Sequence, residues 1–347
     1  MKDFTKFLGF GWLVSVAVIV SLAVCAPRAE AKDEWPRTIN ISGGAARTTY
    51  YRAAVVTANI ISKYIEGVTA TAVPTGGATG QVNLMLKGEA QMASLTTGVA
   101  WQGWSRTRKE YLPGGNKLLR QVMAVAAGYF HILVRADSDI HSIYDLKAKK
   151  VMCLSPESVS AQNNFKKILA AYNMTLKDIK AVPRATPSDQ ANALKERTAD
   201  CIYRAGSVPM AYWLDLASSI PIRWISIDKE KLETINAPGY LYLKAPASKY
   251  PGIDKDVWAL GFGTTISART DLPDDLVYEI TKAMLTHLDE IKAVHQMFAP
   301  MGLDFSVSLP VVPFHAGSIK YYREKGVWGS KIDKSNKKLL SVAGAKK

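Results

Sequence analysis

Short apolar runs with the composition of strands alternate with amphipathic segments along most of the chain. Strand-like runs are 38–42 (TINIS), 69–73 (TATAV), 83–89 (NLMLKGE), 91–97 (QMASLTT) and 121–127 (QVMAVAA). Helices are predicted where apolar residues recur every three or four positions, as at Phe165, Ile168, Leu169 and Tyr172 and at Leu276, Ile280, Ala283 and Met284. Strands that alternate with helices predict an α/β architecture with largely parallel sheets.

The length of 347 residues is more than one core usually serves, which predicts two lobes. The run from Tyr129 to Ser155 (YFHILVRADSDIHSIYDLKAKKVMCLS) indicates an extended segment crossing between them, followed by a polar turn and a short helix at "DL". A return crossing is predicted at LGFGTTISARTDLPDD. We therefore expect one lobe from 32–130 plus 255–330 and a second lobe from 131–254, with 331–347 as a basic flexible tail.

The N-terminus carries an export signal. Lys2 and Lys6 precede an apolar run from Phe7 to Ala26 and a small-residue AEA that ends at Ala31. This order is typical of a cleaved secretory signal peptide over 1–31, which predicts a periplasmic protein. An uncleaved membrane anchor is the alternative, because the apolar run is close to the length that spans a bilayer.

The charge of the chain bears on which partners it can bind. Lys and Arg number 44 against 30 Asp and Glu, a formal net charge of +14, and part of the excess lies in the tail. The export signal argues against nucleic acid as the partner and leaves acidic lipid or another protein for the tail.

Cys153 and Cys201 both lie in apolar runs, which favours buried free thiols over a disulfide, although an oxidising compartment leaves the bridge open.

Catalytic motifs are missing from the sequence. Its five histidines are scattered, and it contains no H-E-x-x-H, paired C-x-x-C, G-x-S-x-G or Walker sequence, so neither a metal nor a cofactor is predicted. Small polar residues recur instead at the turns GGAARTTYY, PTGGATGQ, SLTTG, SPESVS and RAGSVP. Where such turns follow parallel strands they meet at the carboxyl edge of the sheet, where ligands bind.

Each turn also has a purely structural interpretation. Thr48 or Thr49 can cap a helix that begins near Tyr50, and Tyr50 and Tyr51 can be core residues. Ser158 and Ser160 can cap the helix that carries Phe165. The binding hypothesis therefore depends on the set of turns and not on any single one.

The order of motifs resembles the TAXI-type solute receptors of tripartite ATP-independent periplasmic (TRAP) transporters over nearly the whole chain. The matching motifs are TTYY, TGG, NL with KGEAQMA, HILVRADSDIHSIYDLKAKKV, SPESVS, ADCIYRAGSVP, DLPDDLVYEITKAM and HAGSIKYYREKGV. The resemblance implies a two-lobed periplasmic-binding-protein fold of the type II class, with hinged lobes, a ligand cleft between them and integral-membrane TRAP subunits as partners.

The resemblance also implies a set of pocket residues: Thr48, Thr49, Tyr50, Tyr51, Thr75, Gly76, Gly77, Thr96, Thr97, Ser158, Ser160 and Gly206. Several positions depart from the family pattern, namely Arg52, Ala78, Glu157 and Val159, and the spacing from TGG to NL is two residues longer. Glutamate or 2-oxoglutarate, ligands of the family, therefore cannot be assumed.

Three functions remain open at this point. The first is a receptor that binds a small organic acid or amino acid, held by two helix N-termini and by the Arg47 guanidinium, with Arg52 as a second candidate. The second is an exported enzyme that reuses the same fold, and the third is a sensory module that signals to a membrane protein.

Overall fold

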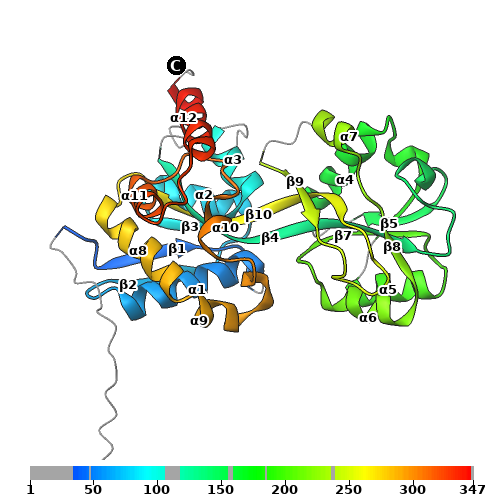
Figure 1. The fold of residues 1–347 in the computed structure, drawn as a ribbon, viewed down its shortest axis with the longest axis horizontal. Coiled ribbons are helices and arrows are strands. Elements are labelled where there is room, and N and C mark those ends of the chain that lie inside the picture. The colour runs from blue at the N-terminus through cyan, green and yellow to red at the C-terminus, as the bar shows by residue number, and fades with distance from the viewer. Residues whose placement is uncertain are drawn as a thin grey trace, which may run out of the picture.

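The computed structural model describes residues 34–46, 48–105, 118–154, 159–183, 186–235 and 239–344. Figure 1 shows two groups of elements side by side, joined by two long strands, β4 (Leu119–Arg135) and β10 (Val257–Arg269). The α/β class predicted from the alternating pattern and the two lobes predicted from the length of the chain are therefore confirmed.

The first lobe is built on a mixed sheet. β1 (Thr38–Ser42) pairs in parallel with β2 (Thr69–Val73) and β3 (Met92–Thr96), and β10 lies antiparallel between β3 and β4. Successive side chains of β3 point to opposite faces. Met92 packs into one apolar cluster, and Ala93 and Leu95 pack into another. Both faces of this sheet are therefore covered.

Helices cover these two faces. The cluster that contains Met92 is closed by α1 (Thr49–Tyr64), α8 (Asp274–Thr286) and α11 (Ala316–Glu324), and the opposite cluster by α2 (Ala78–Lys87) and α3 (Thr97–Ser105). Shorter elements complete the lobe: α9 (Leu288–Val294), a 3-10 turn at Gln296–Phe298 and α10 (Leu303–Val307). The predicted inner face of α8, with Leu276, Ile280, Ala283 and Met284, is buried.

The second lobe is built on the strands at the other end of the sheet. β5 (Lys150–Leu154) pairs in parallel with β6 (Lys180–Pro183) and β7 (Cys201–Gly206), and β7 and β8 (Ile222–Trp224) pair antiparallel to β4. β9 (Leu241–Ala245) pairs antiparallel to β10. The helices are α4 (Val159–Ala171), α5 (Pro187–Lys195), α6 (Ala211–Ser219) and α7 (Lys229–Thr234), with 3-10 turns at Tyr144–Leu146 and Leu176–Asp178.

The two crossing strands link the lobes, but the two lobes have separate cores. Hydrogen bonding through β4 and β10 joins all ten described strands into one sheet. In β4, however, Met123 and Val125 pack in the core of the first lobe, whereas Phe130 and Ile132 pack in the core of the second. The change of core between 126 and 130 lies close to the lobe boundary predicted at residue 130, and the full set of boundaries stays a prediction.

Two expectations differ from the structure. Asn83–Lys87, predicted as part of a strand, lies in α2, which ends where Gly88 adopts a left-handed φ of 78°. The chain beyond residue 330, predicted as a flexible tail, forms helix α12 (Ser330–Gly344). It is held because Asn336 and Leu339 pack against the first lobe.

Cys153 and Cys201 are free and buried, on the neighbouring strands β5 and β7. The residue paired with Cys201 is Val151, so Cys153 lies two positions further along its strand. No helix within the described ranges is both long enough and apolar enough to span a membrane. The predicted signal peptide lies outside those ranges and stays a prediction.

Candidate functional site

Two of the predicted turns pack directly against each other at the carboxyl edge of the first sheet. The hydroxyl of Thr75, after β2, donates a hydrogen bond of 2.7 Å to the carbonyl of Gly43, after β1. The backbone N–H of Thr75 reaches the carbonyl of Gly44 at 3.3 Å. A Cβ atom on Gly43 would lie 2.8 Å from the Cα of Tyr51, so only glycine allows α1 to start this close. The structure thus brings the TTYY and TGG motifs together.

The N-terminus of α1 is capped as the sequence predicts. Thr48 Oγ1 accepts a hydrogen bond from the N–H of Tyr51 at 3.2 Å and donates to the carbonyl of Ala45 at 2.7 Å. The first turns of α1, α2 and α3 carry no acidic side chain, whereas those of α5, α7 and α8 do. The partial positive charge at these three N-termini is therefore not offset by a carboxylate of the same helix.

The third turn connects to the crossing strand. Thr96 Oγ1 accepts a hydrogen bond from the N–H of Val99 at 3.1 Å, and the buried Thr97 Oγ1 accepts one from the N–H of Gly263 in β10 at 3.0 Å. The Thr97 oxygen already has a protein donor, so we assign it to holding α3 on β10. Thr96 is only half-buried and remains the better candidate for contact with a guest.

A segment of the second lobe reaches across to α3. Gly239 has φ of 84°, and a Cβ atom there would lie 2.6 Å from the Thr97 carbonyl oxygen and 2.7 Å from the Cα of Gly98. The ring of Tyr240 lies against Gly98, where a Cβ atom would be 3.0 Å from it. This contact, which no local sequence pattern predicts, places Tyr240 beside the predicted pocket.

Tyr50 of the first lobe and Tyr240 of the second interact electrostatically. Loss of hydration, together with the nearby Tyr240 phenol, raises the pKa of Tyr50 to about 12, and a hydrogen bond with Thr49 acts in the opposite direction. Tyr50 is therefore a neutral hydrogen-bond donor at ordinary pH. The Tyr240 phenol is thus near enough to Tyr50 to influence its ionisation.

Aromatic rings of the crossing strands pack beside Tyr240. The ring of Phe130 lies 6.1 Å from that of Tyr240 and 5.5 Å from that of Phe262, measured between centroids. A Cβ atom on Gly128 would fall 2.3 Å from the Phe262 ring. These ring contacts connect Tyr240 to the core of the second lobe.

The remaining predicted residues are placed less fully. Gly206 ends β7 opposite Tyr129, and a Cβ atom there would lie 2.5 Å from Met210 Cε. Ser160 is in the first turn of α4, but the position of its side chain is not described. Arg47 and Ser158 lie outside the described residues. The structure brings the turns after β1 and β2 together. Their meeting with Thr96, Ser158, Ser160 and Gly206 stays a prediction.

Arg52, the second arginine of the sequence hypothesis, lies on another side of α1. Burial lowers the pKa of His295, which caps the turn at Gln296–Phe298, and the nearby charge of Arg52 lowers it further. Because that turn belongs to the core of the first lobe, Arg52 is a poor candidate for the ligand.

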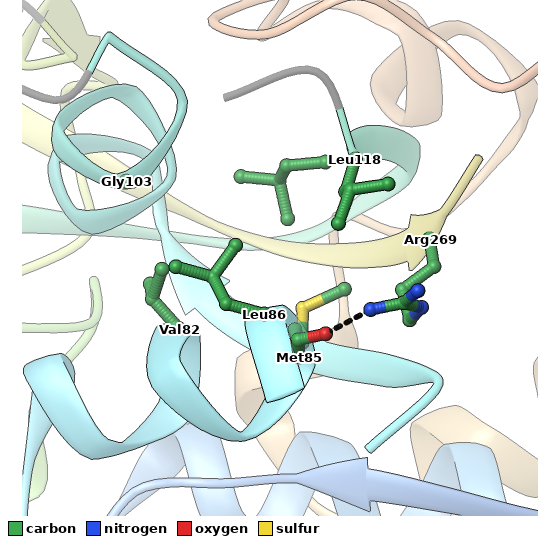
Figure 2. A pocket seen from close by; sticks show the side chains of 7 residues that line it. Val82, Met85, Leu86, Gly103, Leu118 and Arg269 are labelled. Atoms are coloured by element: carbon green, nitrogen blue, oxygen red, sulfur yellow. Dashed lines mark hydrogen bonds between the residues drawn. The ribbon is translucent and has the colours of Figure 1, made fainter. Parts of the chain in front are cut away.

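A separate hollow lies in the first lobe between α2, α3 and the ends of β4 and β10 (Figure 2). Its lining is mostly apolar: Val82, Met85, Leu86, Gly103, Leu118, Leu119 and Arg269. Figure 2 shows the Arg269 guanidinium donating to the carbonyl of Met85. The space left for a water-sized sphere is about 10 Å³, room for roughly one water molecule. This hollow is too small for a solute.

Titratable groups do not gather into a metal site in the described ranges, where no three His, Cys, Asp or Glu side chains are placed to hold an ion. His131 is buried in the second lobe, and His315 lies beside Asp274 in the first. The described side chains that line the candidate site offer hydroxyls, phenols and aromatic rings.

Residues 41–326 match the NMT1-like family, and the chain belongs to that family. Its structure is similar to those of periplasmic binding proteins. With the aliphatic sulphonate binding protein SsuA from Escherichia coli the identity is 14%, the TM-score 0.44, and the match covers 88% of this chain and 94% of the other. With XAC2383 from Xanthomonas citri bound to ATP the identity is 10% and the TM-score 0.47, and the match covers 88% of this chain and 99% of the other.

A third similar structure is the L-cystine solute receptor of Neisseria gonorrhoeae in its unliganded open conformation. Here the identity is 13% and the TM-score 0.39, with 76% of this chain and 92% of the receptor covered. At such identities the similarity concerns the fold and does not extend to a ligand.

Proposed function

We propose that this protein is an extracytoplasmic receptor that captures a small organic anion, a carboxylic acid or an amino acid, in the cleft between its lobes. The observation that supports this most is the meeting of the β1–α1 and β2–α2 turns, joined by the Thr75 hydrogen bonds to Gly43 and Gly44. Together with the β3–α3 turn they direct three helix N-termini without first-turn carboxylates to one edge of the sheet.

The proposed ligand groups follow from this edge. Thr48 to Tyr51, Thr75 to Gly77 and Thr96 would line one wall, while Ser158, Ser160 and Gly206 would line the other. Arg47, between Ala46 and the Thr48 cap, would pair with the carboxylate through two hydrogen bonds. Glu157 would have to point away from an anionic guest.

Export and delivery complete the proposal. Cleavage after Ala31 would release the chain into the periplasm, and the order of the motifs favours a TRAP-type membrane partner. Binding would shift the lobes toward a closed arrangement, since a ligand that contacts both lobes stabilises the closed state. No chemical step is proposed for the bound solute.

A thermal-shift screen of small organic acids and amino acids on the chain from Lys32 onward, followed by calorimetric titration, tests the ligand class. We expect Arg47→Ala to weaken binding of the best ligand by about 2 kcal/mol or more, because it removes one partner of a buried charge pair. Arg37→Ala is the matched control, since Arg37 is exposed at the other end of β1. Unchanged affinity would remove Arg47 from the site, and tight binding of an uncharged solute would overturn the anion proposal.

The partner and the absence of catalysis have their own tests. Uptake of the identified solute by cells that express the receptor with its transporter should continue after ATP depletion if the partner is of the TRAP type. Chemical conversion of the solute on prolonged incubation with the purified protein would favour the exported enzyme instead.

A further inference from the structure

Helix α12 carries a row of exposed lysines, here called the basic stripe: Lys331, Lys334, Lys337 and Lys338. Lys331, Lys334 and Lys338 follow one another at spacings of three and four residues, so they share one side of the helix. Figure 1 shows α12 at the end of the chain on the outside of the first lobe.

The opposite side of α12 fixes how the helix is rotated. The Asn336 side-chain oxygen accepts a hydrogen bond of 2.8 Å from the backbone N–H of Phe314, and only 5% of Asn336 is exposed. Ile332 and Leu339 pack against the two apolar clusters of the first lobe. Since these residues alternate with the lysines at helical spacing, the basic stripe must face away from the protein.

Only one lysine of the stripe, Lys337, is paired with a carboxylate among the described residues. Asp333 is the single acid of α12, and Lys337, Arg323 and the indole N–H of Trp328 contact it at 2.8, 3.4 and 3.0 Å. These contacts lower the pKa of Asp333 to about 2, so it is fully ionised and fully engaged.

The other three lysines keep their charge for an outside partner. Lys331, Lys334 and Lys338 form no ion pair with any carboxylate in the part of the chain that the structure describes. An anionic surface is the complement of such a row.

We propose that the basic stripe docks the protein on an anionic lipid surface. Protein interfaces are enriched in arginine and aromatic residues and depleted in lysine, and this stripe contains lysines alone. Fluid headgroups do not demand the fixed geometry that arginine supplies, so the three unpaired lysines can each contribute their charge to an anionic lipid surface. This surface is independent of the proposed solute and its cleft.

Vesicle co-sedimentation tests this proposal on the chain from Lys32 onward, which avoids binding by the apolar N-terminus. We expect binding to vesicles with about one third phosphatidylglycerol, none to pure phosphatidylcholine, and loss of binding in high salt. Changing Lys331, Lys334 and Lys338 to glutamine should weaken binding about fivefold for each lysine removed. Circular dichroism and thermal unfolding would verify that the variant folds.

A matched control removes equal charge elsewhere. Lys177, Lys180 and Lys195 are exposed in the second lobe and have no ion pair within the described residues. Their change to glutamine should leave vesicle binding nearly unaltered. Equal losses in both triple variants, or no binding of the wild type to anionic vesicles, would overturn the proposal. Retention of the wild type on immobilised polyglutamate without vesicle binding would also overturn it, in favour of an acidic protein face.

Discussion

His131 shows how strongly one side chain depends on its surroundings. It lies in β4 with no exposed surface, stacks on Trp224 at 4.2 Å between ring centroids, and shares a 2.9 Å hydrogen bond between its Nε2 and the Tyr250 hydroxyl. Burial among these rings disfavours the charged imidazole and lowers the pKa of His131 to about 3.

The free energy of unfolding should therefore decrease as the pH falls below about 6.5. The unfolded chain takes up a proton on His131 near pH 6.5, but the folded chain does so only near pH 3. Between these two pH values, protonation of His131 in the unfolded chain should lower the free energy of unfolding by up to about 1.4 kcal/mol for each unit that the pH falls. Urea unfolding of wild type and His131→Gln across this range measures it, and an equal slope in the two proteins would contradict the assignment.

Cys153 and Cys201 give a second prediction at this scale. Burial raises the pKa of the Cys201 thiol well above its ordinary value, and the strand register offsets the two cysteines by two residues. We expect neither thiol to react with iodoacetamide in the native protein and both to react in denaturant without reductant. Mass spectrometry of the alkylated protein decides this, and labelling that requires a reductant would show a disulfide instead.

At the scale of elements, α12 is the largest departure from the sequence prediction. Ile332, Asn336 and Leu339 have helical spacing, but the lysines between them suggested a solvated tail. We expect Asn336→Ala to lower the free energy of unfolding by about 1–3 kcal/mol, because the N–H of Phe314 loses its acceptor.

Lys338→Ala, on the exposed side of α12, should change stability by less than about 0.5 kcal/mol. Chemical unfolding of both variants separates a packed helix from a flexible tail, since a flexible tail would make the two substitutions equivalent.

The elements that could be predicted are those with local causes. The cap at Thr48 and the inner face of α8 follow from residues a few positions apart. Asn83–Lys87 has an apolar pattern too short to distinguish strand from helix, and only its context in α2 decides. In the site, the strand-to-helix turns were foreseen for the same local reason. Tyr240 was not, because it reaches α3 from a distant part of the chain.

At the scale of the whole molecule, the contact between Gly239 and α3 links the two lobes. Gly239→Ala should place a Cβ atom 2.6 Å from the Thr97 carbonyl, whereas Gly252→Ala, at a similar φ of 76°, meets nothing within 4 Å. Both substitutions should lower the free energy of unfolding by about 1 kcal/mol, because alanine is disfavoured in the left-handed backbone conformation.

Only Gly239→Ala should show a further loss of about 1–3 kcal/mol from overpacking. This loss should be seen in the free energy of unfolding or in the free energy of binding the best solute. Urea unfolding and calorimetric titration measure the two quantities. Identical results for both glycine variants would show that this contact carries no energy.

The two crossing strands also dictate an order of folding. β10 fills the space between β3 and β4, and Thr264 pairs with Ala126, which precedes it by 138 residues. A chain emerging from its N-terminus therefore leaves β3 and β4 with open edges until the entire second lobe has followed. Closing so long a loop is slow, and the unpaired edges are prone to aggregate in the meantime. The first lobe, whose sequence appears first, is thus completed last, when β10 and then α12 pack onto it.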